Sequence, residues 1–253
     1  MSNQASVEKA AIVTGAARGI GRAVALRLAQ SGYAIAIVDL LADEAERTAH
    51  DIRGLGVDAM VVAADVSSLS AAEQGVAAIL ERFGRVDALV NNAGRTMAKG
   101  LLEITEDEWD ATIDVNLKSF FCWCRAAAPA MLAQGGGRIV NISSLNAITG
   151  GVTRAVSKFA YSSAKAGVLG MTKSLAKELG PTIAVNAVLP GIIRTDINAA
   201  QVAQREAEFV DSILMRRLGS AEDIASIVHY LAAEPHMFMT GQHLVVDGGQ
   251  WIT

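Results

Sequence analysis

The chain has 253 residues, of which 51% are hydrophobic and 19% are charged, and its formal net charge is −4. This length and apolar content are sufficient for one large α/β domain whose sheet is covered on both faces. No basic tract is present, which disfavours nucleic acid as a partner. Charged residues interrupt the apolar stretches before they reach membrane-spanning length, and residues 1–6 do not resemble a signal peptide. We therefore expect a cytoplasmic protein that binds neither nucleic acid nor membranes.

A strand, a glycine-rich turn and a helix are expected at the start of the chain. Residues 9–13 form a short apolar run typical of a buried strand, and residues 21–31 have the apolar spacing of an amphipathic helix. Glycines in the turn between them let the backbone approach a pyrophosphate, and the helix N-terminus offers free N–H groups to that anion. The turn reads Thr14-Gly15-Ala16-Ala17-Arg18-Gly19-Ile20-Gly21. We expect a dinucleotide site that includes Gly15, Arg18, Gly19, Ile20 and Gly21.

Asp39 ends a second apolar run, 33–38. It lies about 20 residues beyond the turn, where dinucleotide-binding folds place an acidic residue. A carboxylate there accepts hydrogen bonds from the 2′-hydroxyl of NAD, but it repels the 2′-phosphate of NADP by about 4 kcal/mol per charge pair at ~4 Å and an effective dielectric of ~20. Arg18 has the opposite effect, since a guanidinium pairs with phosphate. Because Arg18 can swing away from the 2′ position, we expect NAD as the cofactor, with NADP as the less favoured alternative.

Strand-like and helix-like runs alternate along the rest of the chain. Strands are expected at 57–64, 86–90, 137–142, 183–189 and 242–246, and helices at 70–83, 106–132, 159–179 and 221–232. This alternation is typical of a Rossmann-type doubly wound parallel sheet, here of about seven strands, with helices on both faces. No linker divides the chain, so we expect a single domain over 1–253, with 1–7 as a flexible N-terminus. Ligands of such folds bind beyond the carboxyl ends of the strands, where Asp65, Asn92 and Ser144 are expected.

Tyr161 and Lys165 stand one helical turn apart on the expected helix 159–179. A free tyrosine has a pKa of ~10, so a phenolate at neutral pH must be stabilised by about 3 pKa units, or about 4 kcal/mol. A lysine on the same helix face supplies a positive charge for that shift. Tyr161 is therefore predicted to be the general base when an alcohol is oxidised and the general acid when a ketone is reduced. Ser144 is expected to hydrogen-bond the reacting oxygen.

Taken together, these segments resemble the short-chain dehydrogenase/reductase family from near residue 8 to near residue 250. The matching segments are the turn 14–21, Asn91-Asn92-Ala93-Gly94, Asn116, Ser144, Tyr161 with Lys165, 190–195 and 247–249. The resemblance implies that Asp65 and Val66 contact adenine and that Asn92 lines the path of the cofactor. It also implies that Ile193 and Thr195 hold the nicotinamide carboxamide.

The catalytic residues implied by the resemblance are Asn116, Ser144, Tyr161 and Lys165. Lys165 would also reach the nicotinamide ribose beside Tyr161, and Asn116 would anchor a water that relays protons past Lys165. The stretch between Ser144 and Tyr161 is longer than is usual in the family, which leaves Ser143 as an alternative to Ser144.

We therefore expect a short-chain NAD(P)-dependent oxidoreductase that moves a hydride between nicotinamide and the carbon of a secondary alcohol or ketone. A lid is expected at 192–217, and the favoured substrate is a sugar, a polyol or a hydroxy acid. The alternative is a 3-oxoacyl-(acyl-carrier-protein) reductase that uses NADPH. Asp39 and the uncharged stretch 131–137 disfavour it, because an acidic carrier needs basic residues. A non-catalytic NAD-binding sensor or scaffold is a third possibility, disfavoured by the complete catalytic set.

Self-association is expected, as a homotetramer or a homodimer. The expected helix 106–132 carries Phe120, Phe121 and Trp123. In the family this helix pairs with the helix that bears the tyrosine across a dimer interface. The three aromatic side chains are therefore candidates for an interface, with packing in the chain's own core as the alternative.

Cys122 and Cys124 are the two cysteines of the chain. Residues two apart on a helix point to different faces, so we expect buried or interfacial thiols rather than a disulfide or a chelating pair. The four histidines are scattered along the sequence. No metal site is expected.

Overall fold

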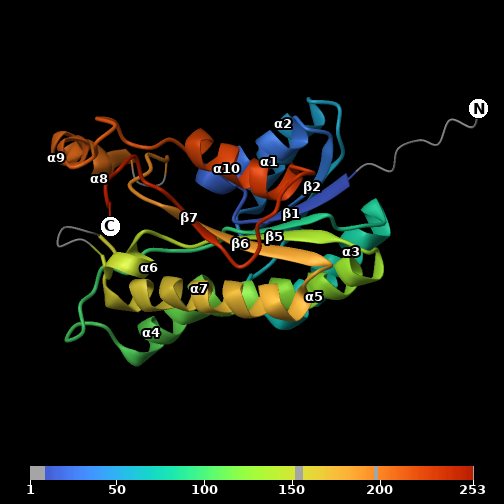
Figure 1. Cartoon of the computed structure of the whole chain (residues 1–253), viewed down its shortest axis with the longest axis horizontal. Coiled ribbons are helices and arrows are strands. Elements are labelled where there is room, and N and C mark those ends of the chain that lie inside the picture. Colours follow the sequence, from blue (N-terminus) through green and yellow to red (C-terminus); the bar gives the residue numbers. More distant parts are fainter. Residues whose placement is uncertain (1–8, 152–155, 197–198, 253) are drawn as a thin grey trace, which may run out of the picture.

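The computed structural model describes residues 9–151, 156–196 and 199–252. The segment 1–7, expected to be flexible, lies outside these residues. The strands of the described part form one parallel sheet of seven strands in the order β3-β2-β1-β4-β5-β6-β7 (Figure 1), which confirms the Rossmann-type sheet. The strands are β1 (Lys9–Thr14), β2 (Tyr33–Asp39), β3 (Ala59–Ala63), β4 (Ala88–Asn91), β5 (Gly137–Ile142), β6 (Ile183–Pro190) and β7 (His243–Val246).

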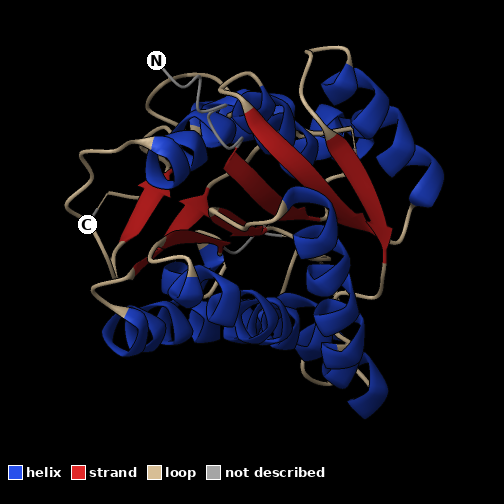
Figure 2. Cartoon of the chain, turned by 90° about the vertical axis from the view of Figure 1, so that its right-hand side faces the viewer, coloured by secondary structure: helices blue, strands red, loops and turns tan. Residues whose placement is uncertain are grey.

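Helices cover both faces of this sheet (Figure 2). One layer contains α1 (Gly19–Ala29), α2 (Ala42–Arg53) and α10 (Ala221–Ala233). The other contains α3 (Leu69–Phe83), α5 (Ser119–Ala133) and α7 (Phe159–Leu179), with α4 (Glu106–Ile113) packed against α7. The short helices α6 (Asn146–Thr149), α8 (Ala199–Gln204) and α9 (Glu206–Asp211) gather at one end of the molecule (Figure 1).

Strand β1 shows why the strands of this sheet read as continuous apolar runs. Successive side chains of a strand point to opposite faces. Ala11 and Val13 therefore pack in the core beneath α1 and α10, while Ile12 packs in the core beneath α3 and α5. Because both faces are covered, neither face needs polar residues.

The aromatic side chains of α5 pack differently from the interface role considered for them. Phe120 and Trp123 are fully buried within the chain itself, so the expectation that they contribute to a subunit interface is wrong. Phe121, at 47% exposure, points outward. Cys122 and Cys124 are free and buried, as expected for structural thiols.

The segment expected as one helix over 106–132 is divided by a π-helical turn, Asp114–Lys118. Asn116 lies in this turn, and its side chain enters the backbone hydrogen-bond pattern, because its Nδ2 donates to the Thr112 carbonyl at 3.0 Å. A polar side chain inserted into the backbone hydrogen-bond ladder widens the helix. Within the described residues, no helix is both long and apolar enough to span a bilayer.

Candidate active site

The carboxyl ends of the strands open onto a cavity of about 930 Å³. Most of the residues expected at the site line it, although they come from segments far apart in sequence. Gly19, Gly21 and Asn116 are not among the residues that line it. The expected residues that line it are Gly15, Arg18, Ile20, Asp39, Asp65, Val66, Asn92, Ser144, Tyr161, Lys165, Ile193 and Thr195.

The glycine turn after β1 is close-packed at two of its glycines. Gly15 has φ +65°, and a Cβ there would lie 2.8 Å from the Ala93 Cα. A Cβ on Gly21 would lie 2.1 Å from the Gly15 carbonyl oxygen. Only glycine fits such an approach without moving the backbone. The turn can therefore pack against Ala93 and against the start of α1 only because both positions lack a side chain.

Asn92 holds this turn in place. Its Nδ2 donates to the carbonyl oxygens of Thr14 and Gly15, at 3.0 Å in each case, and its backbone N–H donates to Thr14 Oγ1 at 2.9 Å. Asn92 thus lines the cavity, as expected, but its amide is committed to the backbone of the turn. Asn92 therefore positions the glycine turn.

The N-terminus of α1 faces the cavity without a capping side chain. Arg18 is the N-cap residue, in an extended conformation, and neither a side-chain cap nor an acidic residue occupies the first turn. The first N–H groups of a helix have no partner inside the helix and attract anions. With Gly15 lining the cavity beside this helix end, this part of the cavity fits the pyrophosphate of a dinucleotide.

Asp39 lies at the end of β2 with both carboxylate oxygens engaged. Oδ2 accepts the N–H of Ala17 at 3.0 Å, and Oδ1 accepts the N–H of Leu41 at 3.1 Å. These bonds fix the carboxylate at the cavity wall. Arg18 extends away toward Glu44, with 3.9 Å between the guanidinium and the carboxylate. The carboxylate is therefore more firmly placed than the guanidinium.

Asp65 and Val66 follow β3, and Ile193 and Thr195 follow β6, on other parts of the cavity wall. Asp65 accepts hydrogen bonds from the backbone N–H and the hydroxyl of Ser67 at 2.9 and 2.7 Å. Both bonds favour the ionised carboxylate and lower the pKa of Asp65. Ile193 forms an isolated β-bridge with Gly219, which anchors the start of the segment after β6.

Tyr161 and Ser144 face the cavity together. Tyr161 lies in the first turn of α7 and Ser144 just beyond β5. Burial raises the pKa of Tyr161, and a side-chain hydrogen bond with Ser144 acts in the opposite direction. Ser144, rather than Ser143, is therefore the serine that reaches the phenol. Ser143 is buried, and its hydroxyl donates to the Lys165 carbonyl at 2.8 Å.

Lys165 is 3% exposed, and its Nζ donates to the Ile142 carbonyl at 2.9 Å. Its Nζ also lies 4.8 Å from the centre of the Phe120 ring and 5.8 Å from that of Tyr161. Burial lowers the pKa of Lys165 to about 7. The expectation that the lysine charge lowers the pKa of Tyr161 is thus not met in this structure, because the ammonium is directed at a carbonyl and the net effect of burial on the phenol is to raise its pKa.

Asn116 is completely buried behind Lys165. Its Nδ2 donates to the Arg95 carbonyl at 3.0 Å, and its Oδ1 accepts the Arg95 N–H at 3.2 Å. A Cβ on Gly94 would lie 2.8 Å from Asn116 Oδ1 and 3.4 Å from Lys165 Nζ. The bare backbone of Gly94 therefore lets these two side chains approach each other, and Asn116 ties the loop after β4 to the π-helical turn.

Several cavity residues were not expected from the sequence. Leu40 and Leu41 follow Asp39 directly, and Gln250 follows the expected motif 247–249, so their proximity could have been inferred from those neighbours. The others depend on how distant loops fold over the sheet. They include Arg95, Thr96, Leu145, Asn146 and Val156. Val202, Gln204, Arg205 and Phe209 also line the cavity, and they belong to the segment 192–217, where a lid is expected. Among the described residues, no group of three His, Cys, Asp or Glu side chains could hold a metal ion.

A glycine cradle and a tyrosine–serine–lysine set on one cavity of a Rossmann-type sheet define a dinucleotide-binding oxidoreductase. Comparisons with known proteins agree. A family model described as enoyl-(acyl carrier protein) reductase matches residues 15–250. A 3-oxoacyl-[acyl-carrier-protein] reductase of Staphylococcus aureus is 39% identical over 246 residues, which are 96% of this chain and 98% of that protein.

Two further matches have similar extent. A (2S)-[(R)-hydroxy(phenyl)methyl]succinyl-CoA dehydrogenase subunit of Thauera aromatica is 39% identical over 244 residues, 96% of each chain. The crystal structure of a glucose/ribitol dehydrogenase of Brucella melitensis superposes with a TM-score of 0.87 at 32% identity and covers 97% of both chains. The chain belongs to the short-chain dehydrogenase/reductase family. It is an oxidoreductase of this family, which uses a nicotinamide cofactor.

Proposed function

We propose that this oxidoreductase interconverts a 3-oxoacyl thioester and the corresponding 3-hydroxyacyl thioester. The observation that carries the substrate class is the similarity, at 39% identity over nearly full length, to two proteins named for acyl thioester substrates. One is a reductase of a 3-oxoacyl group and the other a dehydrogenase of a hydroxyacyl-CoA. The alternative considered from the sequence is thereby preferred to the sugar, polyol or hydroxy acid favoured there.

Tyr161 is the proposed proton donor in reduction and acceptor in oxidation. With its pKa raised by burial, the phenol carries a proton at neutral pH that it can give to the oxygen of a ketone, and the hydrogen bond with Ser144, which acts to lower the pKa, favours that release. Ser144 shares a hydrogen bond with this phenol and can hold the same oxygen within reach. When bound, the nicotinamide supplies or accepts the hydride. The residues of this chain place the oxygen and move its proton.

Lys165 and Asn116 are proposed to connect Tyr161 with the interior. The Lys165 pKa of about 7 lets the amine gain or lose a proton near neutral pH. Asn116 lies beside it, with its amide bonded to the loop after β4. We infer that Asn116 positions this loop and the lysine, so that its role is structural support of the proton path.

The cavity wall supports an acyl substrate more than a polyol. Val202 and Phe209, from the segment after β6, belong to an apolar cluster with Ile192, and all three line the cavity. Leu145 and Val156, between β5 and α7, add further apolar surface. Such surface favours burial of a hydrocarbon chain. A sugar or polyol remains the second candidate, because of the likeness to the glucose/ribitol dehydrogenase structure.

The substrate class is tested by following absorbance of the reduced nicotinamide with purified protein. We expect acetoacetyl-CoA to be reduced with a kcat/KM at least tenfold above that for any ketose in a panel. 3-Hydroxybutyryl-CoA should likewise be oxidised faster than ribitol or glucose. Turnover of a polyol without turnover of either thioester would establish the second candidate. Absence of turnover with every ketone and alcohol would leave only a cofactor-binding role.

We also propose NAD(H) as the preferred cofactor. The Asp39 carboxylate is held at the cavity wall by two backbone N–H groups, whereas Arg18 is directed toward Glu44. The residues after Asp39 are Leu40 and Leu41, so no basic side chain follows it directly to receive a 2′-phosphate.

We propose that residues 1–253 act as one catalytic domain and that the protein self-associates as a homotetramer or homodimer. Strand β1, which precedes the glycine turn, lies in the same sheet as β5 and β6, which precede Ser144 and Ile193. This shared sheet supports the first proposal. The second is supported by Phe121, exposed on α5, and by Gly170 of α7, which has open space where a Cβ would project. Sedimentation velocity at micromolar concentration should give a dimer or tetramer, and Phe121→Glu should weaken it. A monomeric parent protein would refute self-association.

A further inference from the structure

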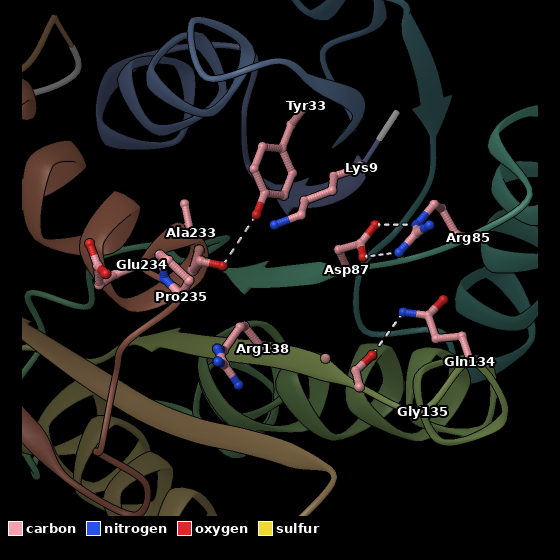
Figure 3. A pocket seen from close by; sticks show the side chains of 13 residues that line it. Lys9, Tyr33, Arg85, Asp87, Gln134, Gly135, Arg138, Ala233, Glu234 and Pro235 are labelled. Atoms are coloured by element: carbon pink, nitrogen blue, oxygen red, sulfur yellow. Dashed lines mark hydrogen bonds and ion pairs between the residues drawn. The ribbon is translucent and has the colours of Figure 1, made fainter. Parts of the chain in front are cut away.

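A second cavity, of about 310 Å³, lies at the amino ends of the strands, whereas the proposed active site lies at their carboxyl ends. Figure 3 shows the residues that line this second cavity. The amino ends of β1, β2 and β5 form its floor, and the C-terminal end of α10 and the loops before β4 and β5 form its sides. Its charged and phenolic residues are Lys9, Tyr33, Arg85, Asp87, Arg138 and Glu234. None of them is used by the chemistry proposed above.

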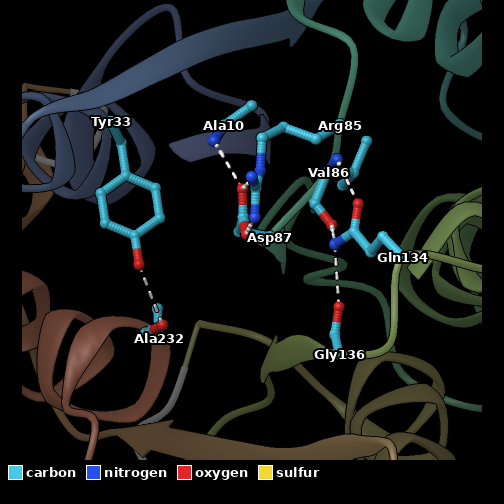
Figure 4. A network of polar contacts seen from close by, with 8 residues as sticks. All are labelled: Ala10, Tyr33, Arg85, Val86, Asp87, Gln134, Gly136 and Ala232. Carbon is cyan, nitrogen blue, oxygen red and sulfur yellow. Dashed lines mark hydrogen bonds and ion pairs between the residues drawn. The ribbon is translucent and has the colours of Figure 1, made fainter. Parts of the chain in front are cut away.

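One wall of this cavity is a closed ion pair. Arg85 Nε and Nη2 donate to the two carboxylate oxygens of Asp87 at 2.7 and 2.6 Å, and the Ala10 N–H donates to Asp87 Oδ2 at 2.9 Å (Figure 4). A bidentate pair of this kind is geometrically rigid. Arg85 and Asp87 are therefore committed to each other, and this wall is preformed.

Gln134 and Tyr33 fix two other walls. The Gln134 amide accepts the Val86 N–H at 3.2 Å and donates to the Val86 and Gly136 carbonyls at 2.6 and 2.8 Å (Figure 4). It thereby joins the loops before β4 and β5. Tyr33 is 3% exposed, and its hydroxyl donates to the Ala232 carbonyl at 3.4 Å. The cavity is thus framed by hydrogen-bonded groups from four separate segments.

Lys9 and Arg138 differ from the other charged residues of the cavity. Within the described part of the chain, neither has a hydrogen bond or an ion pair from its side chain. In Figure 3, Lys9 lies on the same side of the hollow as Tyr33, and Arg138 lies on the other side. The Lys9 ammonium is 5.7 Å from the centre of the Tyr33 ring. Burial and the Asp87 charge raise the pKa of Tyr33, and the Arg138 charge acts on this phenol in the opposite direction.

The charge balance of the cavity favours an anion. Its cations are Lys9, Arg85 and Arg138, and its carboxylates are Asp87 and Glu234. After the Arg85–Asp87 pair is set aside, two cations face one carboxylate. Glu234 also accepts the backbone N–H of His236 at 3.1 Å, so part of its hydrogen-bonding capacity is used locally. The two remaining cations come from different strands, β1 and β5, and both line the cavity.

We propose that this cavity binds a small dianion, a phosphate ester or a dicarboxylate, between Lys9 and Arg138. The planar guanidinium of Arg138 matches the geometry of either oxyanion, and Lys9 supplies a second point charge. A cavity of 310 Å³ lies at the lower end of the range for small-molecule sites. The proposal does not depend on the proposed function, because the two cavities lie at opposite ends of the strands.

Isothermal titration with glycerol 3-phosphate and with succinate tests the proposal. The cofactor cradle also attracts phosphate, so the titrations are made with NADH present at saturation. We expect one saturable site for at least one probe, and at least tenfold weaker binding after Arg138→Gln or Lys9→Gln. Arg47→Gln is the matched control, because Arg47 is an exposed arginine of α2 outside both cavities.

The outcomes separate the two oxyanions and decide the proposal. Binding of glycerol 3-phosphate or of succinate that depends on Arg138 supports the site and identifies the group it recognises. The proposal is overturned if neither probe binds saturably, or if Arg138→Gln and Arg47→Gln bind equally well. Thermal unfolding without ligand checks that each variant is folded. Because Lys9 and Arg138 have no polar side-chain partner to lose, we expect unchanged midpoints.

Discussion

Replacement of Tyr161 by Phe should lower kcat by about 10²–10⁴-fold, the range expected for loss of a positioned general acid. The change removes one oxygen atom from a side chain whose hydroxyl interacts with Ser144. It leaves the ring and its contact with Lys165 Nζ, 5.8 Å from the ring centre, in place. Cofactor affinity should therefore change by less than about fivefold, which is about 1 kcal/mol. Steady-state kinetics and cofactor fluorescence titration measure the two quantities.

Tyr230→Phe is the matched control for this variant. Tyr230 is 44% exposed on α10, and it lines neither of the two cavities described above. Its replacement should leave kcat unchanged. If Tyr161→Phe were as active as Tyr230→Phe, the proton would have to come from another group, and the proposed mechanism would fail.

The sequence predicts the elements whose apolar pattern is strong. The limits of β5 and α7 agree with expectation at both ends. Clear breaks flank β5, and Gly180-Pro181 follows α7 directly. Helix α2 was not predicted, since three of its four buried positions are Ala45, Thr48 and Ala49. These positions have helical spacing, but they stand among charged residues and give the segment little apolar content. The helix packs against α1 and the strands β2 and β3.

Features that depend on contacts between distant segments could not be predicted. The π-helical turn at Asn116 depends on its bonds to Thr112 and to Arg95 in the preceding loop. The burial of Trp123 depends on Gly75 of α3, which leaves room for the indole: a Cβ on Gly75 would lie only 3.0 Å from the ring. Likewise, the sequence spacing correctly predicts that Lys165 and Tyr161 share a helix face. It does not predict the direction of the ammonium, which donates to the carbonyl of Ile142 in β5.

Asp39→Asn should raise the ratio of kcat/KM with NADP to kcat/KM with NAD by about 10²–10³-fold. One unit-charge repulsion at ~4 Å is worth about 4 kcal/mol at an effective dielectric of ~20, and partial solvent exposure reduces it. An asparagine has one acceptor oxygen, so only one of the bonds from the Ala17 and Leu41 N–H groups can persist. Activity with NAD should therefore fall as well, and the ratio is the quantity that reports the charge.

Glu44→Gln separates the effect of Asp39 from that of Arg18. It removes a nearby carboxylate and frees Arg18, whose guanidinium lies 3.9 Å from it. Exposed ion pairs contribute about 0–1 kcal/mol, so this variant should change the ratio by less than about fivefold. Equal shifts in both variants would mean that Arg18, once released, controls the choice of cofactor. A small shift for Glu44→Gln beside a large one for Asp39→Asn would assign the choice to the carboxylate that two backbone N–H groups hold at the cavity wall.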